Sequence, residues 1–270
     1  MRGITFLIIN LLLLTSCGQH KSTPTRNVFA ELQQRRDFYV QQIESLDDKS
    51  VVFTKPCDRL TFQALYSAFG IKQDLSGFEV ESGHWVRRVP ACYPHESRST
   101  ISRDSYIMMM HNWWTHNDLD AVVRSIEYAE DNYFTVGKGE SLDLINIAPL
   151  MPIMWRIEER LQLTGIIEEN LTGFKGHLLF MYIYLASRVE GHLTNIKLDL
   201  LEELVDHNPE NLLYWALFNR YSGRDQTGVI NKALEIFPAD HLPTDEAIWG
   251  WGSSPDAVTF ILLVAILEGK

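Results

Sequence analysis

Ten segments of this chain carry apolar residues three or four positions apart, and this helical spacing limits the fold more than any other feature. The expected helices are 28–46, 58–69, 102–115, 118–131, 142–163 (broken at Pro149 and Pro152), 174–190, 196–207, 211–222, 226–236 and 255–268. Gly, Asn or Pro residues stand in the gaps between them, as is typical of helix ends. No sheet is convincing, so the sequence predicts an all-α fold of packed antiparallel helical hairpins.

One long segment, residues 71–101, is the exception to this pattern. Glycines and prolines, among them Gly83 and Pro90, interrupt any long helix, and the alternation around residues 78–81 allows at most a short strand. Long irregular segments inside a domain are usually functional or disordered, and the aromatic and cysteine content of this one favours order. We therefore expect this loop to contribute to a functional site.

The N-terminus combines Arg2, a mostly apolar run over residues 4–14, and the sequence Leu14-Thr15-Ser16-Cys17. A short basic region, an apolar core and small residues before a cut site are typical of an export signal, and the run is too short for a membrane span. The segment resembles the lipobox of bacterial lipoproteins. This resemblance implies that Cys17 becomes the first mature residue, carries a diacylglyceryl thioether and anchors the protein to a membrane. The alternative is an ordinary secretory signal with a chance cysteine.

The domain organisation follows from this leader. We expect a signal peptide at 1–16, a polar flexible tether at 17–27 and a single all-α domain at 28–270. Gly18 stands where an aspartate tends to signal inner-membrane retention in lipoproteins of two-membrane bacteria. The resemblance therefore implies a lipid-anchored protein of the bacterial cell envelope, at the outer membrane and facing the periplasm. The apolar segment 255–268 is too short to cross a bilayer and is expected to be a buried core helix.

Export would place the two remaining cysteines, Cys57 and Cys92, in an oxidising compartment, where an even pair predicts a disulfide. The alternative is two buried free thiols. Two cysteines without a neighbouring histidine pair do not complete a zinc site. The sequence also lacks a Gly-rich phosphate loop, a His-Glu-x-x-His motif and a Gly-x-Ser-x-Gly elbow, so we expect neither metal nor cofactor.

The charge balance bears on the choice of partner. The chain has 24 basic and 35 acidic residues and a formal net charge of −11. An acidic surface repels phosphate backbones, and no run of Lys or Arg interrupts it. Nucleic acid is therefore excluded as a partner.

The segment 83–90 contains the first group of candidate binding residues: Trp85, Arg87 and Arg88 lie close together in the irregular loop. Tryptophan suits stacking, and arginine suits bidentate contacts with anions. The alternative is that Trp85 packs in the core and the arginines lie in solvent or pair with acids.

The second and third groups lie at the start of helix 102–115 and near the C-terminus. Arg103 and Asp104 open that helix, where an acidic residue also complements the helix dipole; the Met and Trp residues of 108–114 are interpreted as packing. Trp249 and Trp251 are separated by glycine, which suits a sugar-stacking platform. The alternative for these two rings is that they seal the end of the last helix.

Helical hairpins with Ser-Arg-Asp opening an inner helix and Trp-rich loops at one rim resemble the α/α toroids of six-hairpin glycosidases and polysaccharide lyases. This resemblance implies a catalytic or sugar-binding role for Asp104 or Asp58. Glycosidases need a second carboxylate, and the sequence does not decide among three candidates: Asp118, Asp245 and Asp256. If Cys57 pairs with Cys92, one cleft gathers the residues Asp58, Trp85, Arg87, Arg88, Arg103 and Asp104.

Two hypotheses of function follow. In the first, the protein is a lipid-anchored envelope protein with a carbohydrate-binding or glycoside-cleaving cleft between the 71–101 loop and the 249–256 rim. In the second, it is a non-enzymatic helical interaction module that binds another envelope protein through its acidic face. The sequence fixes no reaction, and it identifies no protein partner.

Overall fold

Most of the residues that the computed structural model describes, 27–46, 59–71, 73–87, 101–138, 144–162, 176–243 and 257–269, lie in α-helices. These helices are α1 (Val28–Glu44), α2 (Arg59–Ser67), α3 (Arg103–His116), α4 (Leu119–Asp131), α5 (Met151–Gln162), α6 (Gly176–Glu190), α7 (Asn195–His207), α8 (Leu212–Ser222), α9 (Thr227–Ile236) and α10 (Ala257–Glu268). Two short antiparallel hairpins accompany them: β1 (Glu79–Glu81) with β2 (His84–Trp85), and β3 (Thr135–Lys138) with β4 (Leu144–Asn146). The predicted all-α class is confirmed at this level.

Helix caps explain several of the boundaries. The side chains of Asn27, Asp118 and Asn211 accept hydrogen bonds from backbone N–H groups in the first turns of α1, α4 and α8. Such caps satisfy donors that lack a partner within the helix. Asn117, with φ at 53°, is the C-cap of α3 in the left-handed conformation, and Asp118 is the N-cap of α4. The two residues form the short turn of the expected α3–α4 hairpin.

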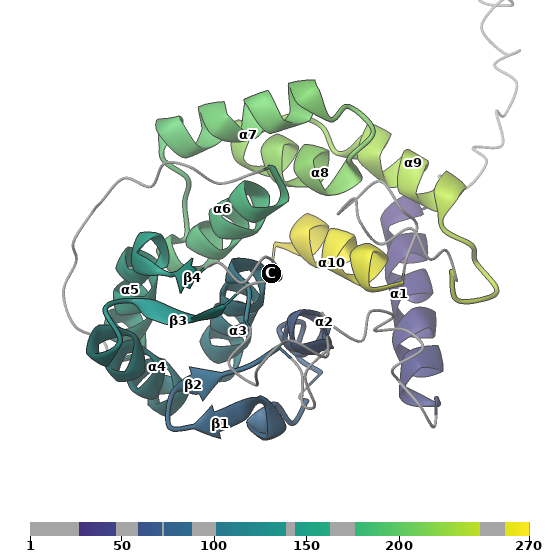
Figure 1. The fold of residues 1–270 in the computed structure, drawn as a ribbon. Coiled ribbons are helices and arrows are strands. Elements are labelled where there is room, and N and C mark those ends of the chain that lie inside the picture. The colour runs from purple at the N-terminus through teal and green to yellow at the C-terminus, as the bar shows by residue number, and fades with distance from the viewer. Residues whose placement is uncertain are drawn as a thin grey trace, which may run out of the picture.

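The helices divide into an inner and an outer group (Figure 1). The inner helices α3, α6, α8 and α10 bury long runs, Ser105 to Trp113, Phe180 to Ser187, Leu212 to Asn219 except Trp215, and Ala257 to Ile266. The outer helices bury only one stripe each; α7, for example, buries Leu201, Leu204 and Val205. A helix that is buried on all sides belongs to the core, so α10 is the core helix that the sequence predicts. In the described part of the chain, no helix has the length and apolarity needed to span a membrane.

The first half of the predicted helix 142–163 is wrong. Residues Leu144–Asn146 form strand β4, and a 3₁₀ turn, η4 (Ala148–Leu150), leads into α5 at Met151. Proline cannot donate a backbone hydrogen bond, so a helix accepts Pro152 only in its first turn. The residues before the turn pair instead with β3, which the chain reaches through the positive φ angles of Tyr133 and Phe134.

The described part of the irregular loop is more ordered than expected. After the 3₁₀ turn η3 (Ser76–Phe78), strands β1 and β2 form a hairpin that lies against α4. At the hairpin turn Gly83 has φ at +73°, and a Cβ atom there would lie 2.0 Å from the Arg124 carbonyl oxygen. Arg124 also donates two hydrogen bonds of 2.9 Å to the Glu79 carboxylate. The glycine and this bidentate pair hold the hairpin in place.

Candidate functional site

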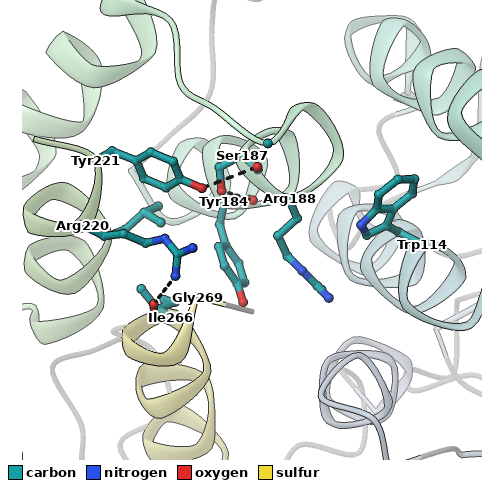
Figure 2. Close-up of a pocket in the computed structure, with 10 residues that line it drawn as sticks. Trp114, Tyr184, Ser187, Arg188, Arg220, Tyr221, Ile266 and Gly269 are labelled. Atoms are coloured by element: carbon teal, nitrogen blue, oxygen red, sulfur yellow. Dashed lines mark hydrogen bonds between the residues drawn. The ribbon is translucent and has the colours of Figure 1, made fainter.

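A pocket of about 280 Å³ opens where four inner helices end, α3, α6, α8 and α10. Trp114, Arg188, Arg220 and Ile266 each stand two positions before the last residue of their helix, and all four line this pocket. The four helices therefore present their C-terminal ends to the same place (Figure 2). We call it the helix-end pocket, and it is lined by Trp114, Tyr184, Ser187, Arg188, Gly191, Leu217, Arg220, Tyr221, Ile266 and Gly269.

Arg188 is held in the pocket by side chains of α3. Its Nη2 donates to Thr115 Oγ1 at 2.9 Å, and its Nη1 lies 3.3 Å from His111 Nδ1. Burial, together with the Arg188 charge, keeps the pKa of His111 well below its ordinary value. The imidazole is therefore neutral, with Nδ1 accepting from Arg188 and Nε2 donating to the carbonyl oxygen of Met181 at 3.4 Å. The neutral imidazole of His111 adds no charge beside the Arg188 guanidinium.

Arg220 reaches the pocket from α8. Its Nη1 donates to the carbonyl oxygen of Ile266 at 2.8 Å, and its guanidinium carbon lies 5.5 Å from the centre of the Tyr221 ring. Gly269 follows α10 with φ at +89°, and a Cβ atom there would lie 2.7 Å from Arg220 Nη1. The position therefore needs glycine both for its backbone conformation and for the close approach of the guanidinium.

Tyr184 lies between the two guanidiniums in the view of Figure 2. Its ring packs against His111 with centroids 4.9 Å apart. Burial raises the pKa of Tyr184 to about 12, although the charges of Arg188 and Arg220 act in the opposite direction. The phenol is therefore protonated at neutral pH and keeps its hydrogen as a donor.

The lining of the helix-end pocket contains no aspartate or glutamate. Within the described residues, neither Arg188 nor Arg220 has a carboxylate oxygen within 4.0 Å. The pocket thus combines two positive charges and hydrogen-bond donors with aromatic rings. This combination suits binding, because acid–base hydrolysis of a glycoside needs carboxyl groups.

Trp85, a predicted substrate-binding residue, lies in the core. Its side chain is 4% exposed, its Nε1 donates to Ser125 Oγ at 2.9 Å, and its ring packs against Trp113 at 5.7 Å. Arg87 is also buried, and its carbonyl oxygen accepts from the N–H of Leu60. These contacts favour the packing alternative for Trp85 and leave no open indole face for a sugar.

Arg103 and Asp104 lie in the first turn of α3, both half-buried. Asp104 is ten positions before Trp114, which at a rise of about 1.5 Å per residue places it roughly 15 Å away along the helix axis. The structure therefore does not bring these two predicted residues into the helix-end pocket. Arg103 Nε is buried and lacks a hydrogen-bond partner within the described chain.

The other predicted site residues lie outside the described residues. They are Asp58, Arg88, Trp249 and Trp251, together with Cys17, Cys57 and Cys92. Their roles in binding, lipidation and disulfide formation stay predictions.

A Ser–His contact elsewhere in the fold has the geometry of a nucleophile and its base. Ser67 Oγ lies 3.0 Å from His116 Nε2 and accepts a hydrogen bond of 2.8 Å from Asn112 Nδ2. Ser67 is 0% exposed, so a substrate cannot reach it, and the contact is structural. The described residues also contain no group of three or more His, Cys, Asp or Glu side chains placed to hold a metal ion.

The comparisons with known proteins do not identify the site: no family model, no curated protein and no solved structure matches this chain.

Proposed function

We propose that the protein is a lipid-anchored protein of the bacterial cell envelope whose helical domain binds a small carbohydrate-type ligand in the helix-end pocket. The observation that carries this proposal is the convergence of three aromatic residues and two arginines at the ends of four helices. A volume of about 280 Å³ is at the lower end of the range for small-molecule sites and suits a ligand the size of a monosaccharide.

Aromatic rings at the pocket support a ring-shaped ligand. Trp114 and Tyr221 are partly exposed, so each offers some ring surface to a bound molecule. The C–H groups of a sugar pack on such faces, while its hydroxyl groups need the hydrogen-bond partners that arginine supplies. The absence of carboxylates from this lining favours binding over glycoside cleavage.

We also propose that the fold is an incomplete α/α toroid. Inner helices α3, α6, α8 and α10 end at one pocket, and α7 carries the chain from α6 to α8 along the outside (Figure 1). Two helices, α4 and α5, lie between α3 and α6, so the alternation is incomplete there. Alternation of inner and outer helices is the connectivity of such toroids.

A glycan array probed with the mature, detergent-solubilised protein tests the binding function. We expect a subset of saccharides to bind, and Trp114→Ala to lower the affinity for them about fivefold to tenfold, because it removes an aromatic face worth about 1–1.4 kcal/mol. Trp155→Ala is the matched control, since Trp155 is 42% exposed on α5 and does not line the pocket. An array without any bound saccharide, or equal losses in the two variants, would contradict the proposal.

The lipid anchor has its own test. We expect Cys17→Ser to abolish incorporation of a fatty-acid label, because the thioether to diacylglycerol needs the cysteine sulfur. Metabolic labelling followed by mass analysis of the N-terminal peptide measures this directly. A wild-type chain without label, or a labelled serine variant, would refute the anchor.

A further inference from the structure

We propose that the ligand of the helix-end pocket carries an oxyanion, a carboxylate or a phosphate ester, which Arg188 and Arg220 bind together. This inference rests on the proposed binding function and adds the chemical class of the ligand to it.

Several arginines of this acidic chain pair with a carboxylate. Each member of the following set has a carboxylate oxygen within hydrogen-bond distance: Arg35, Arg36, Arg124, Arg156 and Arg224. Arg188 and Arg220 have none within the described residues, although the chain has 35 acidic side chains. Arg103 and Arg160 also have none there, but they do not line the pocket, whereas Arg188 and Arg220 share it. Two uncompensated charges at one pocket are a local exception to the net charge of −11. An anionic ligand would supply the missing partner.

The hydrogen bonds of the two guanidiniums leave donors available. Arg188 uses Nη2 for Thr115 and directs Nη1 to His111, and Arg220 uses Nη1 for Ile266. A guanidinium has five N–H donors in a planar fork, so these contacts fix each fork while leaving several N–H groups for an oxyanion. Thr115 and His111 thus act as positioning residues for Arg188. Because each guanidinium is held in place before binding, less conformational entropy is lost when a ligand binds.

The alternative role for the two arginines is to offset the partial negative charge at the ends of four helices. Arg220 does so in part, through its bond to the Ile266 carbonyl oxygen in the last turn of α10. Arg188, however, is held by the hydroxyl of Thr115 and the ring of His111 instead of a terminal carbonyl. Helix-end effects fall off within one turn and are worth less than a direct charged hydrogen bond. A ligand oxyanion in contact with both forks therefore outweighs the helix ends.

The experiment compares matched ligands on the mature, detergent-solubilised protein: glucose, glucuronate, glucose 6-phosphate and inorganic phosphate. Calorimetry should show that at least one anionic sugar binds tenfold or more tightly than glucose, with an affinity that falls as salt is added. The carboxylate and phosphate arms tell which oxyanion the pocket prefers. Inorganic phosphate reports on the oxyanion without the sugar ring.

Variants assign the preference to the two arginines. Arg220→Gln should lower the affinity for the anionic sugar at least tenfold more than the affinity for glucose, and Arg188→Lys should do the same because it keeps the charge but loses the fork. Arg224→Gln is the matched control, because Arg224 follows α8, is exposed and pairs with Glu202 outside the pocket. The melting temperature of each variant reports whether the fold is intact.

The outcomes separate the two proposals. Equal affinity for glucose and both anionic sugars overturns the oxyanion while leaving the carbohydrate function in place. Binding of phosphate with no binding of any sugar supports the oxyanion and overturns the carbohydrate function. No binding of any of the four probes overturns both proposals. A preference that survives in both Arg220→Gln and Arg188→Lys overturns the oxyanion contact with the two arginines and leaves carbohydrate binding in place.

Discussion

Replacing Trp85 with alanine is expected to lower the free energy of unfolding by about 3–5 kcal/mol, because it leaves a large cavity in the core. The indole is 4% exposed and lies against Trp113 between α3 and α4. Its Nε1 also donates to Ser125 Oγ, which in turn donates to the carbonyl oxygen of Ala121 at 2.7 Å. The substitution removes one hydrogen bond and one aromatic contact together. Urea denaturation followed by circular dichroism measures the effect.

Two further variants show how much of the loss comes from the buried volume of Trp85. Trp85→Phe keeps most of the buried volume and should cost about 1–2 kcal/mol, chiefly for the lost hydrogen bond. Trp155→Ala, at a position 42% exposed, should cost less than about 1 kcal/mol. If Trp85→Ala unfolds like the parent chain but no longer binds saccharides, Trp85 is a ligand residue after all and the packing interpretation fails.

Helix positions could be predicted from the sequence because burial of one face imposes a spacing that is visible in the chain itself. The segment 196–207, for example, becomes α7, which buries Leu201, Leu204 and Val205. Hairpin β3–β4 could not be predicted, since Leu144 and Ile145 fit a helix as well as a strand when their partners are unknown. Only the contact with β3, about ten residues away in the chain, selects the strand.

The residues of the helix-end pocket could not be recognised as a site from the sequence. An arginine in the last turn of a helix is explained by the helix dipole alone, so neither Arg188 nor Arg220 differs in sequence from an ordinary capping charge. The sequence predicts packing for both Trp113 and Trp114. Trp113 is buried as predicted, but Trp114 lines the pocket. Neighbouring helix positions face different directions, and only the packed helices show which of them faces a cavity.

The predicted catalytic residue Asp104 lies far from the helix-end pocket along α3. Asp104 is in the first turn of α3 and Trp114 in its last turn, so the helix presents the predicted site and the observed pocket at opposite ends. A carboxylate at one end cannot act on a ligand held at the other. The binding proposal for the pocket is therefore independent of whether Asp104 has a role of its own.

The protein should lose stability through His111 when the pH falls from about 7 to about 5, by at most about 2 kcal/mol. Burial, and then the charge of Arg188, hold the pKa of His111 well below its ordinary value of 6.5 in the folded state. Below pH 6.5 the unfolded chain takes up a proton at this position while the folded chain does not. The unfolded state then binds more protons, so stability falls with falling pH and is fully present only above the unfolded pKa.

His111→Gln tests this assignment, because glutamine supplies polar atoms near the same place but does not titrate. Urea denaturation of parent and variant at both pH values should show that the pH-dependent loss is smaller in the variant, by at most about 2 kcal/mol, whatever its stability at neutral pH. His84, whose pKa burial also lowers, accounts for a remaining dependence in the His111 variant. If parent and His111→Gln lose equal stability between the two pH values, His111 takes up its proton in the folded state as readily as in the unfolded state, and the lowering of its pKa by burial and by Arg188 is ruled out.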